Sequence, residues 1–240
     1  MSKNASSMPW ERPEPRPRPA PVPLSRDAIV RTAIALADAE GLSAVTLRNV
    51  ATALGAGPMR LYGYIATKED LLALMIDAVY AEMLAEKETP ADEWRLQIAT
   101  LACALRGAAF RHPWFIALLG GRPHQGPNAL AFTEAMLAAV ADAPSLDGID
   151  AIFQAAKVIG AYVLGAVRDE TAEAVAVLES EMTKAEWQAE NWPYMQRMIA
   201  TGRFPMLARV ISEMDHPTPE AVFYEGLECV LDGIARRSPN

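Results

Sequence analysis

The chain has 240 residues, of which 51% are apolar and 22% charged, an ordinary composition for a globular protein of one large domain or two smaller ones. Its two cysteines exclude a disulfide framework and a CxxC metal site. The apolar runs are short, so we expect a cytoplasmic protein with no membrane partner. The net charge of −8 divides unevenly: the first 68 residues net +4, with nine Lys and Arg against five Asp and Glu, and the remainder nets −12. A basic end on an acidic chain indicates a polyanion-binding segment.

Residues 1–24 are rich in proline and arginine. Proline has no amide donor and biases the preceding residue away from the helix, so this segment is expected to be an extended, disordered arm. Two interpretations stay open for it: a solvated tail, or a basic arm that lies on DNA through Arg12, Arg16 and Arg18.

Four helices are predicted after the arm. Their start signals are three N-cap residues and one proline at a first helical position: Ser25, Thr46, Thr67 and Pro58. Gly41 and Gly55 end the first two helices. The second helix, a short glycine turn and a third helix over 58–65 have the spacing of a helix-turn-helix.

The third helix has few apolar anchors, Leu61 and Ile65. Its other side chains include an arginine and two tyrosines, which suit a groove-reading surface better than a core. The alternative for the tyrosines is core packing against the first helix. The candidate DNA contacts, including flanking positions, are Thr46, Arg48, Pro58, Met59, Arg60, Tyr62, Tyr64 and Lys68.

A longer pattern covers this region. It reads Leu54-Gly55-Ala56 … Leu61-Tyr62-x-Tyr64-Ile65-x-x-Lys68-Glu69-x-Leu71-Leu72, and is preceded by Gly41-Leu42 and Thr46-x-Arg48. Through this pattern, residues 26–75 resemble the N-terminal domain of the tetracycline-repressor (TetR) family. The resemblance implies an all-α fold with three segments: the arm 1–24, a three-helix DNA-binding domain 25–70, and a larger ligand-binding and dimerisation domain 71–240.

The rest of the chain fits that layout. Further helices are predicted over 68–88, 91–111, 114–119, 128–141, 146–168, 184–188, 205–213 and 218–236. Helices 146–168 and 218–236 are too apolar for surface helices. By resemblance they pair with their copies in a four-helix bundle, which makes a homodimer. The alternative is that they are core helices of a monomer.

The same resemblance implies a small-molecule site among the middle helices. Tetracycline-binding members hold a magnesium–drug complex through a histidine, whose place Leu118 takes here, and a glutamate, whose place Asp169 takes. Leu118 cannot ligate a metal, so we expect neither metal nor cofactor and a more apolar pocket. The candidate lining residues are Leu101, Leu105, Trp114, Leu118, Arg122, Leu130, Glu134 and Phe153. Glu134 would suit a ligand with an amine or several hydroxyls.

Other features carry less chemistry. His112, His124 and His216 have no paired metal-ligand spacing, and we expect solvated loop residues. Trp187, Trp192 and Tyr194 either cover the pocket or pack elsewhere.

The sequence therefore predicts a ligand-responsive dimeric transcriptional regulator, a repressor that binds a palindromic operator in the major groove and is released by an inducer, with no catalytic residues. The alternatives are an all-α ligand-modifying enzyme and an architectural DNA-binding protein without an inducer.

Overall fold

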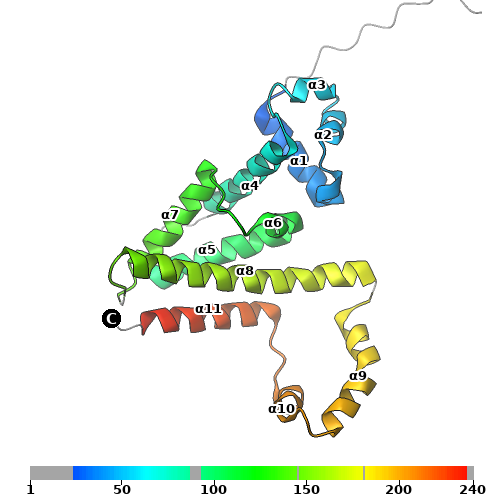
Figure 1. Cartoon of the computed structure of the whole chain (residues 1–240), viewed down its shortest axis with the longest axis vertical. Coiled ribbons are helices and arrows are strands. Elements are labelled where there is room, and N and C mark those ends of the chain that lie inside the picture. The colour runs from blue at the N-terminus through cyan, green and yellow to red at the C-terminus, as the bar shows by residue number, and fades with distance from the viewer. Residues whose placement is uncertain (1–23, 87–92, 145, 181, 237–240) are drawn as a thin grey trace, which may run out of the picture.

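The computed structural model describes residues 24–86, 93–144, 146–180 and 182–236, with side chains for all of them except 173–180. The arm predicted over 1–24 lies outside the described residues, apart from Leu24. Every regular element in the described part is helical, which confirms the all-α fold. The elements (Figure 1) are α1 (Arg26–Glu40), the 3-10 helix η2 (Leu42–Ala44), α2 (Leu47–Ala53), α3 (Pro58–Leu61), α4 (Lys68–Ala85), α5 (Trp94–Arg111), α6 (Pro113–Leu118), α7 (Pro127–Ala141), α8 (Ile149–Ser180), α9 (Lys184–Ala200), α10 (Pro205–Glu213) and α11 (Pro219–Ala235).

Local start signals determine where the first helices begin. The hydroxyl of Ser25 accepts a hydrogen bond from the Ala28 amide over 3.1 Å, and Thr67 forms a reciprocal capping box with Asp70. The predicted caps of α1, α2 and α4 are confirmed. Helices α1–α4 then close around a small core of fully buried side chains: Ile29, Val45, Val50, Leu61 and Leu71.

Helix α4 continues from this N-terminal unit into a larger bundle, where it packs against α5 and α7. At the far side of the bundle α8 and α11 lie side by side and run in opposite directions (Figure 1). The Tyr162 hydroxyl on α8 donates to the Phe223 carbonyl on α11 over 2.8 Å. Arg106 on α5 makes two hydrogen bonds to Glu170 on α8, at 2.8 and 2.5 Å, which ties a third helix to this pair.

Helices α9 and α10 extend away from the bundle (Figure 1) and contact each other. None of their residues is buried. The three aromatic residues that the sequence left open, Trp187, Trp192 and Tyr194, are all exposed within the protomer.

Three helix ends differ from the predictions by four residues or more. Helix α3 ends at Leu61 and not at residue 65, because the amides of Tyr64 and Ile65 both donate to the Leu61 carbonyl in a turn through Gly63. Helix α8 continues to Ser180, since no glycine or proline interrupts residues 166–180. Helix α9 continues past residue 188 to Ala200 and includes Pro193.

The expectation of no membrane partner stays a prediction, because one helix passes a compositional test for a membrane span. By length and composition alone, Ile149–Ala172 of α8 is apolar enough to cross a membrane. This segment packs against α5, α6, α7 and α11 of the same bundle, but only 17% of its apolar window is buried within the protomer. Core helices of globular proteins pass the same compositional test.

Candidate DNA-binding surface and ligand cavity

The turn between α2 and α3 is held by one glycine and two hydrogen bonds. Gly55 has a φ of 62°, in the left-handed region that glycine adopts without strain. The amide of Ala56 donates to the Ala51 carbonyl over 2.8 Å, and the amide of Gly55 donates to the Thr52 carbonyl over 3.0 Å. These contacts fix α3 relative to α2, so that the side chains of α3 are presented on a defined frame.

Two buried residues anchor α3 and its following turn, and three large side chains point outward. Leu61 and Ile65 are 0% and 3% exposed. Met59, Tyr62 and Tyr64 are 81%, 51% and 40% exposed. The two tyrosines thus lie on the surface of the protomer and not in its core. A compact group of exposed apolar and aromatic side chains on a helix-turn-helix has the composition of a surface that enters a DNA groove.

The other candidate DNA contacts flank this group. Arg48 and Arg60 are exposed, and Lys68 is half-buried at the first position of α4. Thr46 accepts a hydrogen bond from the Asn49 amide over 3.1 Å, so its hydroxyl hydrogen remains able to donate to a phosphate.

The start of α4 is not a vacant anion site. Asp70 accepts from the Thr67 amide at 3.1 Å, and Thr67 accepts from the Asp70 amide at 3.0 Å. A carboxylate of the chain itself therefore complements this end of the helix. A phosphate contact at this position would depend on the ammonium group of Lys68 and less on the amides.

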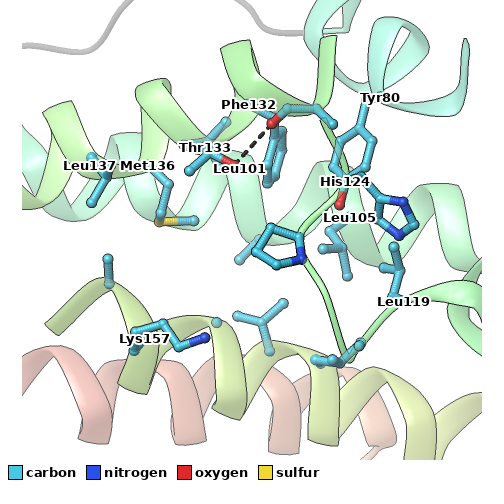
Figure 2. Close-up of a pocket in the computed structure, with 18 of the residues that line it drawn as sticks. Tyr80, Leu101, Leu105, Leu119, His124, Phe132, Thr133, Met136, Leu137 and Lys157 are labelled. Carbon is cyan, nitrogen blue, oxygen red and sulfur yellow. Dashed lines mark hydrogen bonds between the residues drawn. The ribbon is translucent and has the colours of Figure 1, made fainter. Parts of the chain in front are cut away.

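A cavity of about 380 Å³ lies in the bundle between α4, α5, α7, α8 and the loop before α7 (Figure 2). This volume is within the usual range of small-molecule sites. Side chains of α7 form one wall, and Lys157 of α8 lies on the facing wall (Figure 2). The lining residues are Tyr80, Leu101, Ala102, Leu105, Leu119, Gly120, Gly121, Arg122, Pro123, His124, Ala129, Phe132, Thr133, Met136, Leu137, Phe153, Ala156, Lys157, Gly160, Val163 and Leu164.

Half of the candidate ligand contacts line this cavity. Those that do are Leu101, Leu105, Arg122 and Phe153. Those that lie outside it are Trp114, Leu118, Leu130 and Glu134. Leu130 and Glu134 share the outer face of α7 and are exposed. The indole of Trp114 instead donates to Asp38 on α1, over 2.7 Å.

The sequence analysis predicted none of the α7 residues that line the cavity. Ala129, Phe132, Thr133 and Met136 follow one another at the three- and four-residue spacing of a single helix face, and that spacing was visible in the sequence. Choosing Leu130 and Glu134 placed the inner face about one residue out of phase. Lys157, a polar member of the facing wall, was also missed.

Tyr80 joins the cavity to the aromatic core. Its ring lies 5.5 Å from that of Phe115 and 5.4 Å from that of Phe132, measured between centroids. Burial raises the pKa of the Tyr80 hydroxyl above its ordinary value, because the phenolate would lose its hydration. One turn earlier on α4, Asp77 accepts the backbone amides of Asn128 and Ala129 at 2.9 and 3.0 Å and so caps α7.

A histidine joins the N-terminal unit to the bundle. His112 is 7% exposed, so the expectation of a solvated loop residue was wrong for it. Its Nδ1 lies 2.8 Å from Asp38 on α1, and its Nε2 lies 3.0 Å from Glu82 on α4. The two carboxylates sit at opposite ring nitrogens and do not converge on one point. The described residues include no group of three or more His, Cys, Asp or Glu that could hold a metal ion.

Comparisons with known proteins agree with this geometry. Residues 87–238 match the family model described as the tetracyclin repressor-like C-terminal domain. The chain is 33% identical over 229 residues to the HTH-type transcriptional repressor DrrR1 of Streptomyces coeruleorubidus, covering 94% of this chain and 82% of that protein. It is 29% identical to the class A tetracycline repressor of Escherichia coli, covering 89% and 92%.

Solved structures show the same fold. Apo ActR from Streptomyces coelicolor superposes with a TM-score of 0.73 at 24% identity, over 90% of this chain and 97% of that one. The regulator SCO7222, a TetR protein of the same organism, gives 0.70 at 25% identity, over 90% and 100%.

Proposed function

We propose a function for this chain from a premise that the comparisons establish: it belongs to the tetracycline-repressor (TetR) family of transcriptional regulators. It is accordingly a DNA-binding, ligand-responsive regulator. The finer proposal is that it acts as a homodimer in the cytoplasm, represses a promoter by occupying a palindromic operator, and is released by a small-molecule inducer. It needs no catalytic group or cofactor for this.

The exposed surface of α3 is the observation that carries the proposal. Arg60 bonds a guanine edge or a phosphate, and Pro58 and Met59 contact thymine methyl groups. Tyr62 and Tyr64 donate to phosphates, which fixes the register of the helix without reading sequence. Thr46, Arg48 and Lys68 contact the flanking backbone; Thr46 or Arg48 alternatively meets an outer base.

We infer a dimer because one such domain contacts too little DNA for tight specific binding. A two-fold dimer reads two half-sites about one helical turn or more apart. The support for it is the outer face of α8 and α11, where Val158 and Val222 are 54% and 51% exposed. Ile159 and Val163 of the predicted dimer helix 146–168 are buried inside the protomer, so we place the pairing surface on the opposite side of α8.

The inducer occupies the cavity and acts through α4. This helix lines the cavity with Tyr80 and packs against α1 of the N-terminal unit, so a ligand that moves α4 changes the position of the DNA-binding domain. Binding of inducer and of operator are then coupled, and each weakens the other by the same factor.

Fluorescence anisotropy with DNA from around the protein's own gene tests the proposal. We expect binding that survives an excess of unrelated competitor DNA, with a moderate salt dependence. A weak isotherm that is the same for every DNA and disappears with salt would favour the architectural alternative.

A further inference from the structure

The charges that line the cavity have one sign. Arg122 and Lys157 line it, and none of the described lining residues is an Asp or Glu. Glu134, the one carboxylate expected there, is exposed outside the cavity. From this arrangement we propose that the cavity takes an aromatic molecule bearing an anionic group, such as a carboxylate or an acidic phenol, with Lys157 as the partner of that charge. The inference rests on the proposed function and specifies its ligand class.

Lys157 has no ionic partner among the described residues. The residues one turn away on α8 are Phe153, Gln154, Gly160 and Ala161, none of which is acidic. Arg122 in the loop makes no ion pair with a described residue either. Most arginines elsewhere in the bundle are paired: Arg106 binds Glu170, and Arg95 binds Glu228 and Asp232.

The carboxylate of Asp77, close to the cavity wall on α4, is already occupied by hydrogen bonds. Asp77 lies one turn before Tyr80 on α4, and its two oxygens accept from the Asn128 amide, the Asn128 side chain and the Ala129 amide. A ligand cation would therefore meet the positive charges of Arg122 and Lys157 and no carboxylate among the described lining residues. Charge complementarity excludes such a ligand and favours an anion.

The apolar and aromatic side chains on the other walls of the cavity favour a ligand with an aromatic ring system. Figure 2 shows Phe132 and Tyr80 on one side of the space and Lys157 on the other. Phe153 and Met136 add apolar surface that suits a planar ring system. Lys157 is itself exposed, so its attraction for an anion is that of a surface pair, and burial of the rings against Phe132 and Met136 adds to it.

A matched pair of fluorescent probes tests the charge preference. 1-Anilinonaphthalene-8-sulfonate and N-phenyl-1-naphthylamine share one aromatic framework, and only the first carries an anionic group. We expect the full-length protein to bind the sulfonate about tenfold more tightly, at one site per chain. Equal or tighter binding of the neutral probe would overturn the proposal.

Two lysine variants test whether Lys157 causes the preference for the anionic probe. Lys157→Met is expected to weaken sulfonate binding about tenfold and to change binding of the neutral probe less than twofold. Lys184→Met, which removes an equal charge at an exposed position of α9, is expected to change neither. Equal weakening of both probes by Lys157→Met, with unchanged thermal unfolding, would mean that Lys157 only shapes the cavity.

A substitution that fills the cavity tests separately whether the ligand binds there and whether the site prefers an anion. Ala156 lines the cavity, and Ala156→Trp fills it. Loss of both probes in a folded Ala156→Trp protein supports binding in the cavity. If neither probe responds to the plug, the cavity is not the ligand site, and the inducer part of the proposed function fails with the charge preference. A plug-sensitive site without charge preference overturns only the present inference.

Discussion

Asp77 on α4 holds Asn128 at the first turn of α7 by two contacts of 2.9 Å, one from the backbone amide and one from the side-chain amide. One carboxylate thereby joins the helix that leads to the DNA-reading head to the helix that forms a wall of the cavity. Gly126 lies against the same carboxylate so closely that a Cβ there would overlap it. The geometry leaves little freedom for α7 to move without α4.

Replacing that carboxylate should loosen both helices. Asp77→Ala removes the acceptor of three N–H donors, and we expect the free energy of unfolding to fall by about 1–3 kcal/mol. Chemical denaturation measures this change. Asp215→Ala, at an exposed loop position, is the matched control and should change stability by less than about 0.5 kcal/mol. Equal effects of the two substitutions would contradict the role of Asp77 as a cap.

Substitutions on the α3 surface should affect DNA binding and not folding. Arg60→Ala is expected to weaken operator binding by about tenfold or more, since a bidentate base contact is worth about 1–3 kcal/mol. Tyr64→Ala should weaken it by a smaller factor. Arg209→Ala on the exposed α10 serves as the control in the same anisotropy assay. Unfolding of the Arg60 or Tyr64 variants would show that these side chains support the core.

The outer face of α8 should control assembly. Val158→Glu places a charge in the proposed dimer interface, and we expect monomers in analytical ultracentrifugation together with loss of operator binding. Leu130→Glu introduces the same charge at an equally exposed site on α7 and should leave the dimer intact. A dimer that survives Val158→Glu would move the interface elsewhere.

Alkaline pH should destabilise the protein partly through Tyr80. Burial raises the pKa of its hydroxyl in the folded state, whereas in the unfolded chain the group ionises near its ordinary value of about 10. Folding therefore favours the protonated form, and the contribution of Tyr80 to stability is present below pH 10 and falls as the pH rises above it. The Tyr80→Phe variant has no hydroxyl to ionise at this position, so it does not show this loss of stability. The difference in unfolding free energy between the two proteins should stay constant from pH 7 to 9 and then change in favour of the variant.

Features that depend on neighbouring residues in the chain were the ones that could be predicted. Ser25, Thr46, Thr67 and Thr218 each cap the expected helix, since a cap involves only the next three residues. The exposure of Tyr62 and Tyr64 also agrees with a helix that has only two apolar anchors.

Features that depend on distant partners were predicted poorly. Trp114 looks like a pocket residue in sequence, but its indole bonds Asp38, 76 positions away. His112 looks like a loop residue, but carboxylates from α1 and α4 enclose it. Such contacts are set by the packing of helices that one sequence does not place relative to each other.

Hydroxyl-radical footprinting on DNA from around the protein's own gene distinguishes operator binding by a dimer from non-specific binding. We expect two protected half-sites related by two-fold symmetry, with their centres about one helical turn or more apart, and loss of both with Arg60→Ala. Uniform protection, or a single unpaired half-site that persists with Arg60→Ala, would contradict this expectation.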